Sequence, residues 1–456
     1  MEFFIKISQF LLSLSLLIVL HELGHFIPAK LFKTRVEKFY LFFDVKFSLL
    51  KKKVGETVYG IGWLPLGGYV KIAGMIDESM DKEQMQKDPQ PWEFRSKPSW
   101  QRLIIMLGGV TVNFILAFII YILILFVWGN SYVKSDDIKY GYAISKNLEK
   151  YGFQQGDKII SVDGNTLEDL HLKLHSGLNK YFMLRGVNNV IVEHPDDTKS
   201  SIQLGSDIGM ELFESGGFPA FVPRVPVKID SVVSGTPAAL AGFKSGDKLI
   251  SIDGESVFEH NLVNLVNNYN NVPLQFVIDR DGMSEIISVV PEKALNNNSK
   301  LKDSSYQLGI SYSASDSDYF KLQKKNYNLR ESFTEGFKKG YYEINDYLAQ
   351  FKYIFSKKGA SQLGGFGTIY SLFPAKWNWQ AFWYLTAFLS IMLGVLNLLP
   401  IPALDGGHVM FLLYEMVSGR KPSDKFMEYA QTTGFFILIA LVLFANGNDI
   451  YRAIFS

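Results

Sequence analysis

The sequence predicts a polytopic α-helical membrane protein with four transmembrane helices and two small α+β domains outside the membrane. Four long apolar stretches approach the roughly 20 residues that cross a bilayer, and one 13-residue pattern occurs twice between the second and third stretch. The composition agrees with a mixed architecture. Hydrophobic residues make up 48% of the 456 residues and charged residues 20%, which is apolar for a soluble protein but polar for a bundle lying wholly within a membrane.

The apolar stretches predict transmembrane helices at residues 1–28, 103–128, 379–405 and 426–446. We interpret the first as a retained helix rather than a signal peptide, because its apolar run leads into a polar motif and not into a small-residue cleavage site. Two prolines break the third helix near its end. The sequence therefore predicts a bundle of four helices whose third helix is irregular near its end.

Basic residues predict the orientation, because cytoplasmic loops carry an excess of lysine and arginine. They flank the spans in the loop 29–102 and between the third and fourth helices. We therefore expect these loops to be cytoplasmic, and both termini and residues 131–378 to face the opposite side, which for a bacterial inner (plasma) membrane is the periplasm. The residues concerned are Lys30, Lys33, Arg35, Lys38, Lys97, Arg102, Arg420, Lys421 and Lys425.

An internal repeat occupies the long outer segment, where the pattern of residues 152–164 recurs at 242–254. Each copy reads as a Gly-Asp turn, a short apolar strand and an Asp-Gly turn. These signatures resemble PDZ domains. We expect PDZ-like domains at 131–222 and 223–321, followed by an amphipathic or juxtamembrane segment at 322–378.

A metal-binding motif lies at the end of the first apolar stretch. His21 and His25 are four residues apart, so one helix face carries both imidazoles and they can share one Zn²⁺. Glu22 suits the general base, because zinc lowers the pKa of its bound water to about 7 and a carboxylate can take the proton. Ionisable residues in a span need a polar interior, and a metal best explains all three.

The best candidate for the third ligand that a catalytic zinc requires is Asp405. It follows two prolines and precedes two glycines, so its backbone is irregular at membrane depth. Such backbone is tolerated only where it lines a cavity or is buried in protein. His408 competes for this role, but we interpret it as a hydrogen-bonded histidine facing a neighbouring helix. His171 and His175 share the four-residue spacing without an adjacent glutamate, and we interpret them as part of a solvated helix face.

Composition excludes other kinds of site. The net charge of +1 carries no signature of a polyanion partner, so nucleic acid is not expected to bind. The absence of cysteine excludes disulfides and thiolate zinc sites, which leaves His, Asp and Glu as metal ligands.

The paired motifs resemble one family. The histidine motif, the pattern Asn-x-x-Pro-x-Pro-x-Leu-Asp-Gly at 397–406 and the two PDZ-like modules look like the site-two protease family of intramembrane zinc metalloproteases. The tandem modules resemble its RseP type (regulator of sigma-E protease) from Gram-negative bacteria. The resemblance covers nearly the whole chain.

The resemblance implies zinc ligation by His21, His25 and Asp405, with Glu22 as the base and Asn397 contacting the substrate backbone near the scissile bond. It also implies a membrane re-entrant β-hairpin at residues 54–75, whose free edge could add an unwound substrate as an extra strand. Its candidate substrate-binding residues are Gly60, Gly62, Gly67, Gly68 and Tyr69.

The implied substrates are single-span membrane proteins already trimmed on the periplasmic side, such as an anti-sigma factor of the envelope stress response, and remnant signal peptides. Peptide tails could bind the PDZ-like domains.

Two other functions stay open on the residues alone. A membrane zinc transporter would also bury histidines and acids, and a PDZ-bearing membrane adaptor could hold a structural metal. Transporters tend to show repeated halves with matching broken helices, whereas the repeat found here lies outside the membrane. Loss of cleavage in Glu22→Gln with zinc retained would separate a protease from both.

Overall fold

The computed structural model describes residues 1–65, 67–75, 88–168, 170, 174–293, 306–312 and 323–455. The chain divides into two compact units. One comprises residues 1–129 and 326–456, and the other comprises residues 130–325.

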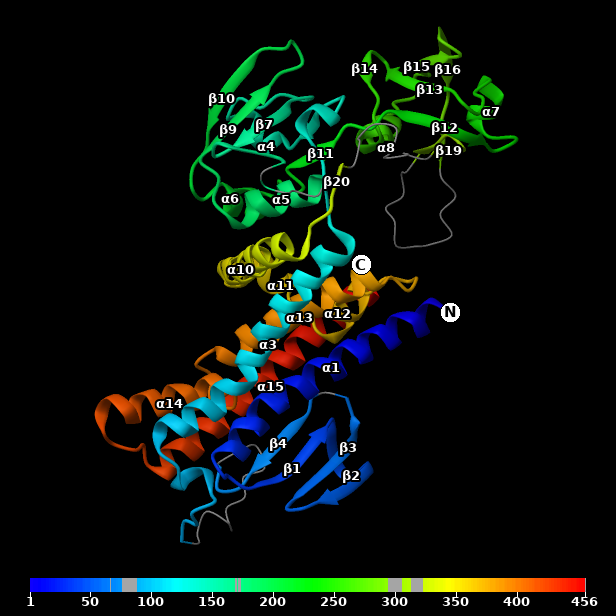
Figure 1. Cartoon of the computed structure of the whole chain (residues 1–456). Helices are drawn as coiled ribbons and strands as arrows, with labels where there is room; N and C mark the ends of the chain where they lie inside the picture. Colours follow the sequence, from blue (N-terminus) through cyan, green and yellow to red (C-terminus); the bar gives the residue numbers. More distant parts are fainter. Residues whose placement is uncertain are drawn as a thin grey trace. The chain divides into compact units, whose positions relative to one another are not determined.

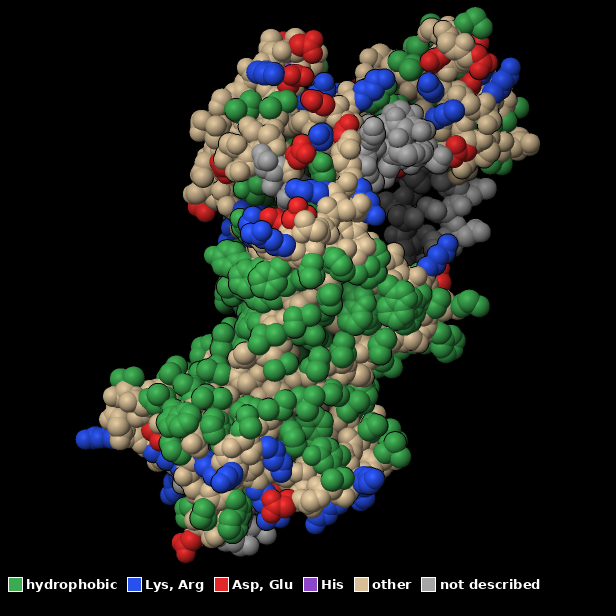
Figure 2. All heavy atoms as spheres, in the orientation of Figure 1, with side chains coloured by type: hydrophobic (Ala, Val, Ile, Leu, Met, Phe, Trp, Pro, Cys, Tyr) green, Lys and Arg blue, Asp and Glu red, His purple; other side chains and the backbone are tan. Residues whose placement is uncertain are grey.

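Four helices of the first unit are long and apolar enough to cross a membrane, which confirms the prediction of four candidate membrane helices. They are α1 (Glu2–Leu31), α3 (Ser99–Trp128), α13 (Trp379–Leu398) and α15 (Asp424–Phe455). Helix α3 packs against both α1 and α13 (Figure 1). On the face drawn in Figure 2, apolar side chains cover these helices, and Lys and Arg side chains gather at the end of this unit that carries its sheet.

Glycines allow α1 and α3 to approach closely. A Cβ atom added at Gly24 would overlap the backbone of Gly108, and one added at Gly108 would overlap the carbonyl of Gly24. Small residues at such a crossing are typical of helices that pack inside membranes. The contact brings the metal motif of α1 against the middle of α3.

A four-stranded sheet follows α1, with strands β1 (Val36–Leu41), β2 (Phe43–Val54), β3 (Thr57–Leu64) and β4 (Tyr69–Ile72) in the order β2-β3-β1-β4. Strand β3 pairs in parallel with β1, and β4 pairs with β1 in an antiparallel sense.

The prediction of a hairpin at residues 54–75 is therefore wrong. The tight turn at Gly55, with φ +62°, joins β2 to β3, so the actual hairpin is formed upstream of the predicted one. Strands β3 and β4 are separated by β1. The alternating pattern indicated strands correctly, but it carries no information about which strands pair.

The broken helix takes a form that the sequence did not predict. Helix α13 ends at Leu398, and a new helix, α14, spans Asp405–Ser418. Asp405 is thus the first residue of a separate helix. Between the two helices Ala403 has a φ of +78°. Pro402 lies against Gly434 of α15, where any side chain would overlap its carbonyl.

The described part of the first unit also contains α10 (Leu329–Ile354), α11 (Lys357–Gln362), α12 (Phe366–Leu372) and the short 3₁₀ helix η1 (Phe94–Ser96). Asn328 and Glu331 form a capping box at the start of α10, which satisfies two free N–H groups. Helix α10 packs on α3 through Gly336 and Gly340, which face Ile122 and Phe118.

The second unit begins and ends with paired strands, β5 (Asn130–Tyr132) and β20 (Gln323–Lys325). Between them lie two hydrophobic cores. The repeated pattern forms the same strand in each, β7 (Lys158–Val162) and β13 (Lys248–Ile252). The other elements around the first core are β6 (Tyr142–Ile144), α4 (Lys146–Glu149), β8 (Asn165–Thr166), α5 (Leu174–Leu184), β9 (Asn189–Glu193), β10 (Lys199–Gln203), α6 (Ile208–Ser215) and β11 (Phe221–Pro223).

The second core is built on β12 (Val227–Val232) and a sheet of order β16-β15-β13-β12-β19. Its other elements are α7 (Pro237–Ala241), β14 (Glu255–Ser256), α8 (Glu259–Asn267), β15 (Leu274–Arg280), β16 (Met283–Val289), β17 (Glu292–Lys293), β18 (Tyr306–Gln307) and β19 (Ile310–Tyr312). Both parts of this unit thus combine strands and helices.

Candidate functional site

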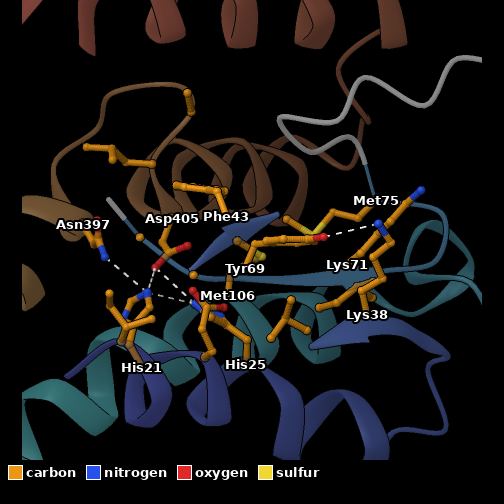
Figure 3. Close-up of a pocket in the computed structure, with 18 of the residues that line it drawn as sticks. His21, His25, Lys38, Phe43, Tyr69, Lys71, Met75, Met106, Asn397 and Asp405 are labelled. Carbon is orange, nitrogen blue, oxygen red and sulfur yellow. Dashed lines mark hydrogen bonds and ion pairs between the residues drawn. The ribbon is translucent and has the colours of Figure 1, made fainter. Parts of the chain in front are cut away.

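Three predicted ligands converge in the first unit. His21 and His25 project from one face of α1 towards Asp405 at the start of α14 (Figure 3). The Nε2 atoms of the two histidines are 3.3 Å apart, and they lie 3.3 and 3.4 Å from Asp405 Oδ2. In the described part of the chain, this is the group of His, Asp and Glu side chains that could hold a metal ion.

The triangle of ligand atoms fits a tetrahedral zinc. Bonds of about 2.0–2.1 Å to a tetrahedral metal place neighbouring ligand atoms roughly 3.3–3.4 Å apart, which is the spacing found here. Asp405 Oδ2 is buried and has no well-aligned hydrogen-bond partner among the described residues. A buried carboxylate oxygen without a hydrogen bond raises the free energy of the folded state. A cation between this oxygen and the imidazoles would remove that penalty.

The ring of His25 is oriented by the backbone of α3. Its Nδ1 atom lies 2.8 Å from the carbonyl oxygen of Ile105. A carbonyl can only accept a hydrogen bond, so Nδ1 carries the proton and donates it. The other nitrogen, Nε2, is then unprotonated in the neutral ring and points its lone pair at the site, as a metal ligand requires.

His21 contacts a residue that the sequence reasoning missed. Asn113 of α3 is fully buried, and its Nδ2 atom lies 3.0 Å from His21 Nδ1. The available signal was an amide in the middle of an apolar span, because polar residues inside membranes are rare and face the protein interior. A hydrogen bond from Ser390 to the carbonyl oxygen of Asn113, at 2.7 Å, ties this turn of α3 to α13.

Glu22 lies in a cavity of about 660 Å³ that also contains the three ligands. A Cβ atom added at Gly68, the residue before strand β4, would come within 3.6 Å of Glu22 Cγ. The base candidate is therefore beside the metal ligands and close to the start of this strand. The cavity continues beyond it along Tyr69 and Phe43, whose rings are stacked, to Lys38 (Figure 3).

The candidate substrate-binding residues separate into two groups. Gly67, Gly68, Tyr69 and Asn397 line the cavity, and the Nδ2 atom of Asn397 lies 3.2 Å from His21 Nε2. Gly68 faces Ile18 and Tyr40 so closely that a Cβ would overlap them.

Gly60 and Gly62 are not among the lining residues. A Cβ at Gly60 would overlap the ring of Tyr40, and one at Gly62 would overlap the backbone of Phe43. These glycines serve packing within the sheet, so their assignment to substrate binding is not supported by their position.

Of the other histidines considered as candidates, His408 is described in the structure. His408 lines the cavity and lies 2.6 Å, through Nε2, from the side-chain nitrogen of Gln431 in α15. This agrees with its interpretation as a hydrogen-bonded histidine facing another helix. His171 lies outside the described residues, and so does the side chain of His175.

Comparison with known proteins adds a family match. Residues 9–441 match the model of peptidase family M50. A protein of Haemophilus influenzae named "Regulator of sigma E protease" is 25% identical, over 99% of this chain and 100% of its own length. The "Regulator of sigma-E protease RseP" of Escherichia coli K12 is 26% identical, over 99% of this chain and 100% of its own.

Proposed function

Because the chain belongs to peptidase family M50, we propose that this cavity is the active centre of an intramembrane zinc metalloprotease in which His21, His25 and Asp405 hold the metal. The observation that carries the proposal is the triangle of three ligand atoms, with sides of 3.3–3.4 Å, beside a buried carboxylate. It joins residues from α1 and α14, which are far apart in the sequence.

Zinc in this site would polarise the scissile carbonyl and lower the pKa of a water molecule to about 7. Glu22 takes the proton of that water and returns it to the leaving amine, as a general base and then a general acid. Its position in the same cavity as the three ligands suits this role.

Asn397 is placed to hold the substrate. The amide of Asn397 lies 3.2 Å from His21 Nε2, and this nitrogen would have no lone pair left for the amide once it held a metal. The amide is then free to donate to a peptide carbonyl, and its oxygen can accept from a peptide N–H. Both bonds require an extended substrate, because the backbone groups of a helix are paired internally.

Strand β4 is the sheet edge closest to this chemistry. It ends the order β2-β3-β1-β4, and Gly68, Tyr69 and Val70 line the cavity. An edge strand offers unpaired N–H and C=O groups. Unwinding a substrate helix in hydrocarbon would otherwise leave such groups unsatisfied, at several kcal/mol each. We assign to β4 the role that the sequence analysis gave to the predicted hairpin.

The substrates we propose are transmembrane segments of single-span proteins already trimmed outside the membrane, including an anti-sigma factor and remnant signal peptides. The names of the relatives from H. influenzae and E. coli support a role in regulating sigma E. We place the protein in a bacterial inner membrane, with its basic loops in the cytoplasm and both termini and the second unit in the periplasm. We further propose that the two cores of the second unit belong to PDZ-like domains.

The test is metal analysis combined with cleavage of a model single-span substrate. We expect one zinc per chain, lost in Asp405→Ala, and retained in Glu22→Gln, which should cleave about 10²–10⁴-fold more slowly. A chelator should abolish activity and added zinc restore it. Full zinc in Asp405→Ala would remove that residue from the site. A transporter or an adaptor would show no cleavage in the unaltered protein.

A further inference from the structure

The imidazole of His21 lies between two amide side chains, those of Asn113 and Asn397. Both ring nitrogens of His21 face an amide nitrogen, Nδ1 that of Asn113 at 3.0 Å and Nε2 that of Asn397 at 3.2 Å. A neutral imidazole has one acceptor and one N–H donor, so it cannot accept from both amides. At least one of the two amides must therefore present its oxygen instead.

The metal site decides which amide turns. Nε2 of His21 is the atom 3.3 Å from both His25 Nε2 and Asp405 Oδ2, so its lone pair belongs to the metal. The proton of the ring then lies on Nδ1, and Nδ1 needs an acceptor. The nitrogen and oxygen of an amide are exchanged by a half-turn about χ2 and are assigned from the hydrogen bonds around them.

Asn113 has the acceptor to offer. Its Oδ1 atom is buried and has no partner among the described residues, and the whole residue is fully buried. A half-turn of the Asn113 amide replaces the hydrogen bond of its nitrogen with one of its oxygen, so the number of hydrogen bonds made by Asn113 is unchanged. His21 gains an acceptor for its Nδ1–H, which would otherwise be buried without one.

We propose that Asn113 is a positioning residue that accepts a hydrogen bond from His21 Nδ1–H and so directs Nε2 at the metal. It acts on His21 as the carbonyl of Ile105 acts on His25, where the 2.8 Å contact is already a donor facing an acceptor. One histidine is thus held by backbone and the other by a side chain. This inference rests on the proposed zinc site.

The experiment measures zinc affinity of the full chain in detergent by competition with a chelator. Asn113→Leu keeps the shape but offers no acceptor, and Asn113→Asp keeps an oxygen facing Nδ1. We expect the dissociation constant to rise about 10–100-fold in Asn113→Leu, the usual effect of losing such a partner. Asn113→Asp should bind zinc at least as tightly as the unaltered protein.

The matched control is Thr386→Val, which removes an equally buried hydroxyl from α13, hydrogen-bonded to Ser13 at 3.0 Å. Its zinc affinity should be unchanged. Equal affinities in the Leu variant and the unaltered protein would overturn the inference. Equal weakening in the Leu and Asp variants would do so as well, because the amide nitrogen or the packing would then matter.

A spectroscopic measurement covers the case in which a variant does not fold. In ¹⁵N spectra of the zinc-loaded, unaltered protein with labelled histidine, a proton on His21 Nδ1 supports the inference and a metal on Nδ1 overturns it. If the unaltered protein bound no zinc at all, the proposed function would fail instead. The two failures are therefore distinct.

Discussion

Gly109 of α3 lies directly against the imidazole of His25, and a Cβ atom at this position would overlap His25 Nε2. The same Cβ would come within 2.7 Å of His21 Cε1. Because Gly109 has no side chain, the space beside it is available for the two imidazole rings.

Gly109→Ala should consequently lose zinc while the bundle stays folded, because the methyl group displaces the rings rather than a core side chain. Zinc per chain and the melting temperature in detergent check this. Gly447→Ala is the control, since that glycine of α15 has open space around it. A Gly109→Ala protein with full zinc would contradict the packing described here.

If the substrate adds to the sheet at β4, a proline on this edge strand should slow cleavage, whereas a proline on the other edge strand should not. Val70→Pro removes a backbone N–H beside the cavity, so cleavage should fall while zinc is retained. Leu49→Pro lies on β2, the opposite edge of the same sheet, and should cleave normally. Equal rates for both variants and the unaltered protein would argue against β4 as the substrate edge.

Asn397→Leu should retain zinc and cleave poorly, because it removes a donor and an acceptor for the extended substrate and no metal ligand. Helix-breaking residues in the substrate span should partly restore the rate, since they lower the cost of unwinding. Loss of zinc in this variant would instead place Asn397 in the metal site.

The second unit should act as a size filter for substrates. Its first and last strands pair directly, with Tyr132 opposite Gln323, so residues 133–322 can be replaced by an Asn-Gly turn that suits a two-residue hairpin. The shortened protein should cleave substrates that still carry a folded outer domain. Trimmed substrates serve as the control and should be cut at the normal rate. Loss of all cleavage would favour a positioning or tail-binding role.

The Gly-Asp turn of the second repeat predicts a pH dependence. Asp247 is 1% exposed and receives hydrogen bonds from Arg280 at 2.7 and 2.8 Å and from the amide of Lys244. Burial tends to raise the pKa of Asp247, but these hydrogen bonds outweigh it and hold the pKa below its usual value. The resulting stability is present above the unfolded pKa of about 3.9 and is lost as pH falls through the folded pKa.

Arg280→Met should therefore destabilise this part of the chain by about 1–3 kcal/mol at neutral pH, because the buried carboxylate of Asp247 loses its hydrogen bonds from the partly exposed Arg280. The difference should shrink in acid. Hydrogen exchange of the β13 and β15 amides in the full chain measures it, with Lys228→Met on the exposed face of β12 as the control. An equal difference at pH 7 and pH 3 would contradict this account.

Features that depend on residues close together in the chain could be predicted from the sequence. Apolar length set the four candidate membrane helices, the four-residue spacing put His21 and His25 on one helix face, and the prolines and glycines around Asp405 indicated the break that frees it. The repeat likewise predicted the matching strands β7 and β13. In each case the information lies within one helical turn, one span or one turn motif.

Features that depend on residues far apart in the chain became known from the folded structure alone. The order β2-β3-β1-β4 places β1 between the two strands that the sequence suggested as a hairpin, because alternation shows which face a residue takes but not which strand pairs with it. Asn113 meets His21 across 92 residues of chain, and α14 brings Asp405 to them from a still greater distance. Helix packing made these contacts, and no local pattern encodes where two helices cross.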